Sequence, residues 1–340
     1  MKKQAPSPIF IVGNSRSGTT LMSKILGRNP EIHSLKEIHF FEQMWNPADP
    51  KTHLDRPATV KLTATLLGHA REGRELHQSP DKYLKEAGQI IASLKESPMH
   101  SPPEIYKVFL EYEARHNDKS IPCEQTPRYI FYLKEILELF PDARIIVMLR
   151  DPRDILLSQK NKWRSYTRGN KVNQLCALLR VWMNYHPILL SQMWKRAMSE
   201  ALHFRDDPRV KFIHFENLVS VPEQVAREIC DFAGIAFQNN MLEVAGSESP
   251  LARQEKTTGI STTPIGRWRK QLPEVDTYWC NRIAGQHMNV LNYKTENSLA
   301  NPIAIAWSAA IFPVKASLAL ILNLTESRNV IGSIRRRLFG

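Results

Sequence analysis

The sequence predicts an α/β protein in which a parallel sheet is flanked by helices, with a helical cap insertion and an apolar helical C-terminal tail. From about residue 9 to residue 234, short apolar runs rich in β-branched residues alternate with segments of helical period. Such alternation is typical of a doubly wound parallel sheet. The run Arg144–Leu149 is nearly continuously apolar, as expected for a strand covered on both faces.

The expected elements follow one another in strand–helix order. The first strand, 9–12, leads through a polar loop into a helix over 19–28, which ends at Asn29-Pro30. The further strands are expected at 31–35, 144–149 and 210–215, and the further helices at 131–140, 154–162, 172–200 with an interruption at Pro187, and 222–233.

Residues 38–120 lack this rhythm and are predicted to form the helical cap. Helical stretches at 83–94 and 103–114 alternate there with loops that carry proline and histidine. Because the composition of the segment does not shift, we expect it to belong to one domain of residues 1–300. Residues 301–340 are expected to form a separate apolar and basic tail.

The net charge indicates which partners the protein can bind, and the cysteines indicate the cellular compartment in which it works. The 340 residues include 46 Lys and Arg against 34 Asp and Glu, a net charge of +12, and 42% of them are hydrophobic, which excludes a disordered or fibrous chain. The positive charge indicates a phosphorylated cofactor, a nucleic acid or an acidic membrane, although a solvated basic surface is the alternative. Four scattered cysteines predict a reducing compartment and no zinc site. Because no secretory signal is recognised at the start, we expect a cytoplasmic protein.

The segment Gly13–Thr20 is the first candidate binding site. It has the Gly-x4-Gly-x-Thr spacing of a phosphate-binding P-loop and lies between a predicted strand and a predicted helix, where backbone N–H groups converge on an anion. Thr19 stands where nucleotide hydrolases have the Walker lysine, and the cation is Arg16 inside the loop. The loop is therefore expected to hold a phosphate without transferring one. A turn that only joins strand to helix is the alternative.

Residues 8–21 resemble the 5′-phosphosulfate loop of the sulfotransferase superfamily that uses 3′-phosphoadenosine 5′-phosphosulfate (PAPS). The resemblance is closest to the branch of the tyrosylprotein sulfotransferases and many bacterial enzymes, which carry Arg-Ser-Gly-Thr-Thr. It implies that Arg16 stabilises the leaving group and contacts the donor. It further implies that the 5′-phosphate is bound by Ser17, Gly18, Thr19 and Thr20.

Residues 140–153, followed by Ser158, resemble the 3′-phosphate motif of the same family. The resemblance implies that Arg150 and Ser158 bind the 3′-phosphate of the donor and that Lys162 is a third basic contact. Arg150 lies at the carboxyl end of a predicted strand, where open α/β sheets bind ligands. Ser158 and Lys162 are four residues apart on one expected helix. A surface ion-pair cluster with the neighbouring aspartates is the alternative.

Two weaker matches extend the resemblance to about residue 295. Residues 212–219 resemble the Tyr-Glu-Asp-Leu strand end of the family, with His214 and Phe215 where tyrosines are usual. Residues 259–272 resemble the C-terminal loop that closes over the nucleotide, in which Arg267 would supply a cation.

The resemblance also implies a catalytic base. Glu37 lies twenty-one residues after Arg16, which is the spacing in the tyrosylprotein branch. A carboxylate there can accept a hydroxyl proton if burial raises its pKa, and a surface ion pair with Lys36 is the alternative. His39 is the second candidate base, because other branches use histidine.

One position departs from the family pattern. Gln125 stands where lysine is common, and a neutral amide attracts a transferring sulfonyl group less strongly than a charged amine. Either Arg128 or a residue of the cap supplies the missing charge, or turnover is slow.

These expectations together describe a sulfotransferase that moves a sulfonyl group from PAPS, without a metal, to a hydroxyl of a small molecule, glycan or lipid. The acceptor would be selected by the cap, and PAPS and its desulfonated form PAP are the expected nucleotide partners. A P-loop kinase or ATPase would need the Walker lysine, and a nucleic-acid-binding protein would need a continuous basic stripe. An inactive nucleotide-binding relative and an oligomer both stay open.

The tail carries its own prediction. Residues 303–322 are apolar apart from Lys315, and Arg328 and Arg335–Arg337 follow. We expect two short helices, separated at Pro313, that lie on the inner face of a membrane with the arginines toward anionic headgroups. Packing on the core or in a dimer is the main alternative, since a lysine at the centre of a spanning helix costs about 2.5–3.5 kcal/mol.

Overall fold

A five-stranded, fully parallel sheet forms the centre of the protein, in the order β2-β3-β1-β4-β5. The computed structural model describes residues 7–47, 52–73, 79–94, 100–162, 182–244 and 259–323. The strands are β1 (Ile9–Gly13), β2 (Ile32–Ser34), β3 (Ile121–Gln125), β4 (Arg144–Leu149) and β5 (Val210–His214). The predicted parallel α/β architecture is confirmed.

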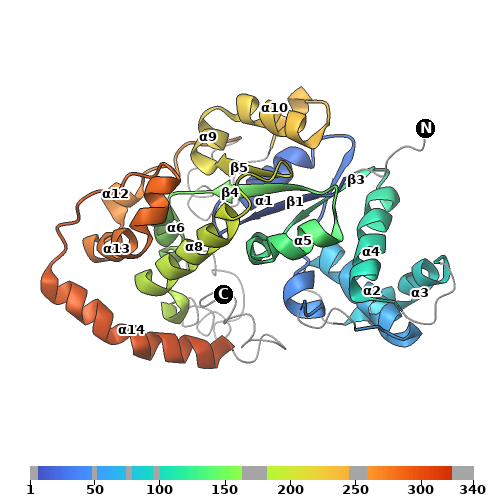
Figure 1. Ribbon diagram of the computed structural model, residues 1–340, viewed down its shortest axis with the longest axis horizontal. Helices are drawn as coiled ribbons and strands as arrows, with labels where there is room; N and C mark the ends of the chain where they lie inside the picture. Colours follow the sequence, from blue (N-terminus) through green and yellow to red (C-terminus); the bar gives the residue numbers. More distant parts are fainter. Residues whose placement is uncertain are drawn as a thin grey trace.

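Helices surround the sheet and extend the molecule at both ends (Figure 1). The helices along the first part of the chain are α1 (Thr19–Leu26), η1 (Phe40–Met44), α2 (Arg56–Glu72), η2 (Pro80–Tyr83), α3 (Leu84–Ala92), α4 (Pro102–His116), η3 (Pro127–Tyr132), α5 (Leu133–Leu139) and α6 (Pro152–Lys160). Those along the second part are α8 (Pro187–Leu202), α9 (Phe215–Ser220), α10 (Pro222–Ala233), η5 (Asn239–Leu242), α12 (Trp268–Gln271), α13 (Glu274–Val290) and α14 (Pro302–Asn323).

Successive residues of β1 face two different hydrophobic cores. Phe10 and Val12 belong to the larger core, which includes α5, α8 and the cap helices. Ile9 and Ile11 belong to the second core, on the other face of the sheet, together with residues of α1 and α10. Because side chains alternate along a strand and helices cover both faces, every residue of β1 is buried.

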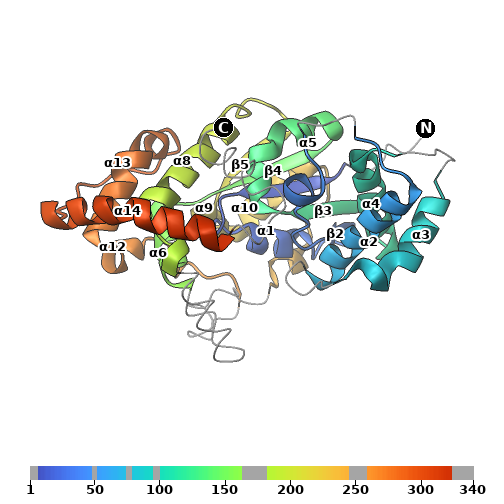
Figure 2. The same cartoon turned by 90° about the horizontal axis from the view of Figure 1, so that it is seen from below.

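The cap helices α2, α3 and α4 lie together at one end of the molecule, next to the β2 edge of the sheet (Figures 1 and 2). Arg71 of α2 joins them, because its guanidinium donates to Glu86 of α3 and to Glu113 of α4 at 2.7 Å each. Side-chain capping starts two of these helices: Asp55 accepts a hydrogen bond from Ala58 N at 2.9 Å before α2, and a Ser101 capping box precedes α4. The predicted helical nature of this insertion is confirmed.

Strand β3 was not predicted, although it lies between β1 and β2 at the heart of the sheet. Its residues Pro122, Glu124 and Gln125 gave no strand pattern, since proline and polar side chains are rare in an interior strand. Pairing with β1 begins only at Cys123, so the missing N–H of Pro122 falls outside that ladder.

The tail differs from its prediction. The helix α14 runs without interruption from Pro302 to Asn323 with Pro313 inside it, so the expected pair of short helices is wrong. A proline removes one backbone hydrogen bond, which a long helix with bonds on both sides can tolerate. The arginines at 328 and 335–337 and the first part of the helix expected over 172–200 lie outside the described residues.

Candidate active site

The loop from Asn14 to Gly18 joins β1 to α1 at the carboxyl end of the central strand. The glycines at its two ends, Gly13 and Gly18, lie too close to their neighbours for any side chain. A Cβ on Gly13 would lie 2.6 Å from the carbonyl oxygen of Met148, and a Cβ on Gly18, whose φ is 92°, would lie 2.4 Å from the ring of Phe215. The sequence pattern Gly-x4-Gly therefore reflects close packing against β4 and α9.

Arg16 connects this loop to the second predicted motif. Its φ of 75° is unusual for a residue with a side chain. Its Nε donates to Ser158 Oγ in α6 at 3.0 Å, and its carbonyl oxygen accepts a hydrogen bond from Arg150 Nη1 at 2.8 Å. The structure thus brings Arg16, Arg150 and Ser158 together from two motifs distant in the sequence.

Arg150 is nearly enclosed, with 8% of its surface exposed. Its Nη2 donates to the carbonyl oxygen of Pro264 at 3.1 Å, and its guanidinium carbon lies 4.4 Å from the centroid of the Phe215 ring. The alternative of an ion-pair cluster with its neighbours does not describe this geometry. Asp151 is bound by Arg153 instead, at 2.7 Å and 2.9 Å, and Arg150 donates to backbone carbonyls.

The electrostatics of the loop favour an anion. Burial lowers the pKa of both Arg16 and Arg150, and the charge of Arg150 lowers that of Arg16 further. Arg150 Nε and Ser17 Oγ are buried and have no hydrogen-bond partner among the described residues. Orphaned donors beside two buried cations fit a ligand with several anionic oxygens, such as a phosphate ester.

The two threonines after the loop occupy different environments. Thr19 is buried at the first position of α1, and Thr20 is exposed at the second. Both lie at the N-terminus of a helix, where the helix dipole favours negative charge.

The C-terminal segment around Gly266 lies against the same arginine. The Asp154 carboxylate in α6 accepts hydrogen bonds from Gly266 N at 2.7 Å and from Trp268 N at 3.1 Å. Burial raises the pKa of Asp154 to about 6, although the charge of Arg150 opposes this. Arg267 is half-buried between the two bonded positions. The structure therefore places this segment beside Arg150.

Lys162 is not placed as expected. The helix α6 ends at Lys160, so Lys162 lies two residues beyond it and is exposed. It therefore does not share a helix with Ser158. Asn161 caps the end of α6, and its side-chain amide donates to the carbonyl oxygen of Leu157 at 3.0 Å.

Gln125 links the loop to the predicted base. This residue ends β3 and is 5% exposed. Its Nε2 lies 3.3 Å from Glu37 Oε1 and 3.3 Å from Thr19 Oγ1. Lys36, the alternative partner of Glu37, donates to the carbonyl of Arg71 at 2.7 Å. Glu37 therefore faces the loop, with 44% of its side chain exposed.

His39 lies between two carboxylates. Its Nε2 is 3.2 Å from Glu37 Oε2, and its Nδ1 is 3.2 Å from Glu42 Oε1. Burial opposes the charge on the imidazole, but the hydrogen bonds to both carboxylates outweigh it and raise the pKa of His39 to about 9. The second oxygen of Glu42 is 3.2 Å from Arg128 Nη1. Arg128 is therefore linked to the predicted base through Glu42 and His39.

Sequence reasoning missed Glu42 and Glu124. The Glu124 side chain is buried in β3, where its Oε1 accepts hydrogen bonds from Ile38 N at 3.2 Å and from Thr126 Oγ1 at 2.5 Å. Burial raises the pKa of Glu124 to about 8. The sequence signal for Glu124 is the polar run Glu124-Gln125-Thr126. At the carboxyl end of a recognised strand, such a run indicates residues of a binding site.

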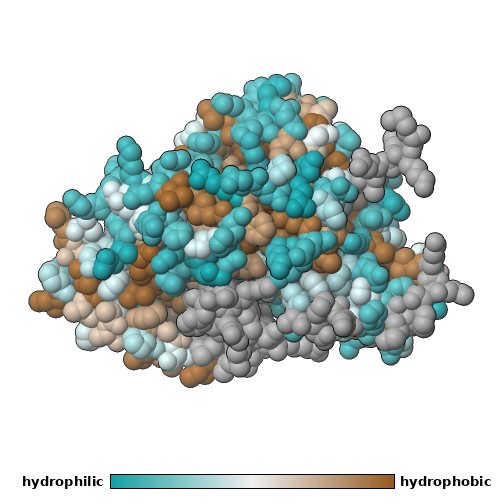
Figure 3. All heavy atoms as spheres, viewed as in Figure 1, coloured by the Kyte–Doolittle hydropathy of each residue, from teal (hydrophilic) through white to brown (hydrophobic). Residues whose placement is uncertain are grey.

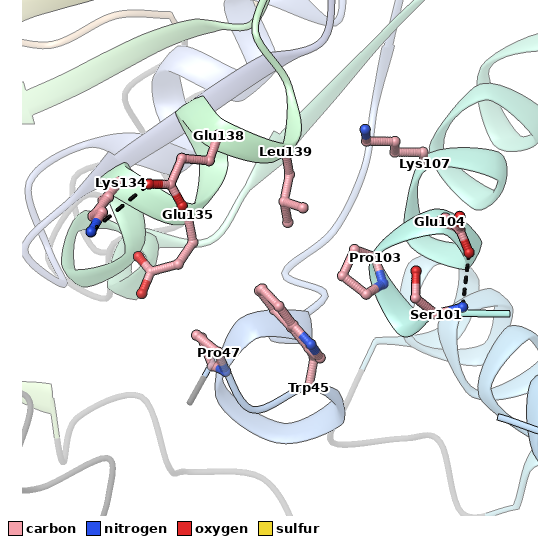
Figure 4. A pocket seen from close by; sticks show the side chains of 10 residues that line it. All are labelled: Trp45, Pro47, Ser101, Pro103, Glu104, Lys107, Lys134, Glu135, Glu138 and Leu139. Carbon is pink, nitrogen blue, oxygen red and sulfur yellow. Dashed lines mark hydrogen bonds and ion pairs between the residues drawn. The ribbon is translucent and has the colours of Figure 1, made fainter. Parts of the chain in front are cut away.

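A separate hollow of about 430 Å³ lies between the end of η1 and the helices α4 and α5 (Figure 4). Trp45 and Leu139 point into it, and charged side chains of α4 and α5 surround its rim (Figure 4). The residues that line it are Trp45, Pro47, Ser101, Pro103, Glu104, Lys107, Lys134, Glu135, Glu138 and Leu139. The predicted site residues lie elsewhere, so this hollow is distinct from the candidate site.

A parallel sheet with a glycine-bounded loop after its first strand, and two arginines buried beside that loop, defines a P-loop-like α/β protein. A family model described as "Sulfotransferase family" matches residues 8–239. The chain belongs to the sulfotransferase family, as its motifs predicted.

Two curated relatives and one solved structure extend this finding. Protein-tyrosine sulfotransferase A of Caenorhabditis elegans is 23% identical over 78% of this chain and 62% of its own length. Carbohydrate sulfotransferase 5 of Mus musculus is 26% identical over 49% of this chain and 47% of its own length. The sulfotransferase domain from the curacin biosynthetic pathway has the same fold, with a TM-score of 0.52 and 19% identity over 86% of this chain and 99% of that domain. The chain spans less than two thirds of the length of these two curated relatives.

Proposed function

We propose that this protein transfers a sulfonyl group from PAPS to a hydroxyl of a small molecule, glycan or lipid. One observation carries the proposal: the segment that holds Arg16 beside Arg150 and Ser158 is also linked, from Thr19 through Gln125, to the carboxylate of Glu37. An anion site and a proton acceptor are the two parts that group transfer to a hydroxyl requires.

The donor would be held at both of its phosphate ends. The 5′-phosphosulfate would lie on the loop, where Ser17, Thr19 and Thr20 and the backbone of Gly18 offer donors. Arg150, Ser158 and the segment around Gly266 would hold the 3′-phosphate end. Support comes from the orphaned Ser17 Oγ and Arg150 Nε, which lie at these two positions. Lys162 and Arg267 are assigned as outer cationic contacts.

The donor supplies an activated sulfonyl group. The protein removes the proton of the acceptor and stabilises the negative charge of the leaving group. Glu37 takes the proton of the acceptor hydroxyl as the new bond from oxygen to sulfur forms. The bond from sulfur to the phosphate oxygen breaks, and Arg16 stabilises the negative charge that this oxygen gains. The acceptor leaves as a sulfate ester, and Glu37 then loses its proton to water.

The contacts of His39 favour Glu37 over His39 as the base. An imidazole with a pKa of about 9 is already protonated on both ring nitrogens at neutral pH, so it cannot accept the proton of the acceptor hydroxyl. Its two N–H groups point at Glu37 and Glu42. His39 is therefore assigned as a positioning residue that orients the Glu37 carboxylate.

The acceptor is assigned by class. Relatives are named as protein-tyrosine and carbohydrate sulfotransferases, and both names specify hydroxyl-bearing acceptors. Glu37 lies at the start of the cap segment, residues 38–120, so the cap would shape the entry of the acceptor. No metal has a role in this scheme.

A transfer assay tests the proposal. Purified protein is incubated with ³⁵S-labelled PAPS and an extract of hydroxyl-bearing metabolites, and labelled products are separated from the donor. We expect label in an acceptor with the wild type and a large loss with Glu37→Gln, which preserves size and hydrogen bonding. Transfer from γ-labelled ATP in place of PAPS would instead support the kinase alternative and overturn the proposal.

A further inference from the structure

The helix α14 presents a continuous apolar stripe to solvent. Its 22 residues include an 18-residue window, Pro302–Ala319, with a mean hydropathy of 1.4, of which 6% is buried. The large residues of the exposed stripe recur at helical spacing; they are Ile303 (78% exposed), Trp307 (68%), Val314 (60%), Leu318 (41%) and Ile321 (60%). In Figure 3 brown and tan atoms form a band at the lower left, where Figure 1 places α14.

The opposite side of α14 faces the protein body. Phe312 packs against His186, with ring centroids 5.0 Å apart. Lys315, the only charged residue of the helix, donates to the carbonyl oxygens of Trp182 and Tyr185 at 3.4 Å each and lies 3.9 Å from the centroid of the Trp182 ring. Burial lowers the pKa of Lys315. The one charge of the helix is therefore turned inward, and the outward stripe carries none.

This geometry favours a helix that lies along a surface over one that crosses a membrane. A spanning arrangement would detach α14 from the body and place Lys315 near the bilayer centre, where a lysine is costly. The observed arrangement keeps Lys315 bonded and points only apolar side chains outward. At 1.5 Å per residue the helix is about 33 Å long, which gives an extended contact line.

Charge indicates which apolar surface the stripe meets. The sequence after the helix, residues 324–340, contains four arginines and one glutamate, and the whole chain has a net charge of +12. Basic residues next to an apolar helix are attracted to anionic headgroups. A second copy of this chain would bring a like-charged tail to the same place, so charge argues against a self-interface.

We propose that the outward stripe of α14 binds the surface of an anionic bilayer, with the helix in the membrane plane and Lys315 still bonded to the body. Trp307 then lies at the depth that tryptophan prefers at an interface. The inference does not depend on the sulfonyl-transfer proposal, because no donor-site residue takes part in it.

Flotation with sealed vesicles tests the proposal on the full chain. We expect the protein to float with vesicles of phosphatidylcholine and phosphatidylglycerol and to bind pure phosphatidylcholine at least tenfold more weakly. The Trp307→Asp/Val314→Asp variant should lose binding by tenfold or more. The matched control is Val221→Asp/Val290→Asp, which changes two exposed valines (45% each), one between α9 and α10 and one at the end of α13, and should bind as the wild type does. Equal thermal midpoints show that both variants are folded.

Two results would overturn the proposal. Equal binding to neutral and anionic vesicles would remove the role assigned to charge. A failure of the wild type to float, together with a dimer that Val314→Asp converts to a monomer, would make the stripe an interface between copies of the chain.

Orientation is tested at the two ends of the helix. Single cysteines in Asn301→Cys and Asn323→Cys are treated with a membrane-impermeant thiol reagent outside sealed vesicles, with unmodified protein as the background. Labelling of both positions supports a helix in the membrane plane. Protection of one position until detergent is added would show a spanning helix and reject the proposal.

Discussion

The side-chain amide of Gln125 donates to the Glu37 carboxylate across 3.3 Å, and the same nitrogen lies 3.3 Å from Thr19 Oγ1. A neutral amide thus occupies the point where the proposed base meets the proposed donor loop. Gln125→Lys would add a positive charge at this junction, and we expect turnover to rise severalfold because charged donors bind an anionic transition state more strongly. Gln125→Met, which has no polar hydrogen, is the control and should lower turnover. Steady-state rates with saturating PAPS decide the point, and a slower Gln125→Lys enzyme would contradict it.

Glu37→Gln should lower turnover by about 10²–10⁴ and leave the dissociation constant of the donor nearly unchanged, because only proton transfer is lost. Single-turnover rates measured beside donor binding show this pattern. His39→Asn should have a smaller effect, since His39 orients the base. If Glu37→Gln turns over near the wild-type rate and His39→Asn does not, the base is His39.

Arg16→Ala should lower both the turnover and the donor affinity. The reason is that Arg16 would contact the phosphosulfate in the ground state and more strongly as charge develops on the leaving oxygen. The same two measurements apply, and Arg227→Ala, at an arginine paired with Glu223 on the exposed side of α10, is the matched control. An Arg16→Ala enzyme with unchanged donor affinity would argue against an anion at this loop.

Arg150→Ala should weaken binding of PAP by about 10- to 150-fold, the equivalent of roughly 1.5–3 kcal/mol for a hydrogen bond to a charged group. Adenosine 5′-phosphate, which lacks the 3′-phosphate, should bind both proteins with similar affinity. Calorimetry with the two nucleotides tests the assignment. Equal weakening of both would show that Arg150 does not recognise the 3′-phosphate.

The raised pKa of His39 predicts that part of the folding stability depends on pH. Its folded-state pKa of about 9 exceeds the ordinary value of 6.5, so its contribution is fully present below pH 6.5 and is lost as the pH rises through 9. The shift corresponds to about 3 kcal/mol. Urea unfolding at pH 6 and pH 9.5 should show a larger loss for the wild type than for His39→Asn. Parallel losses in the two proteins would mean that His39 is not ionised in the folded state.

The buried carboxyl group of Glu124 predicts a second change in folding stability with pH, over a range that overlaps that of His39. Its folded-state pKa of about 8 lies above the ordinary 4.5, so the folded protein holds a proton that the unfolded chain releases, and stability falls as the pH rises from 4.5 to 8. Glu124→Gln cannot ionise and should show a flatter stability curve between pH 5 and pH 8. Identical slopes for the two proteins would place the proton elsewhere.

The sequence predicted most of the sheet because β1, β4 and β5 are apolar runs between clear helical segments. Strand β3 was not predicted because Pro122 lacks a backbone N–H and because Glu124 and Gln125 are polar. These side chains are buried by elements distant in the sequence, which the local pattern does not indicate. The donor-loop residues were found because their spacing is fixed by close packing at Gly13 and Gly18. The network of His39, Glu42 and Arg128 depends on side-chain directions in η1 and η3, which a residue pattern does not specify.

Phe215 supports two residues of the candidate site at once, since its ring lies against Gly18 and under the Arg150 guanidinium. A smaller side chain at this position would loosen the arginine, and a larger one would push against the loop. Neither Gly18 nor Arg150 can therefore change independently of the ring that both contact. A variant that binds a different donor would therefore need coordinated substitutions at Gly18, Arg150 and Phe215.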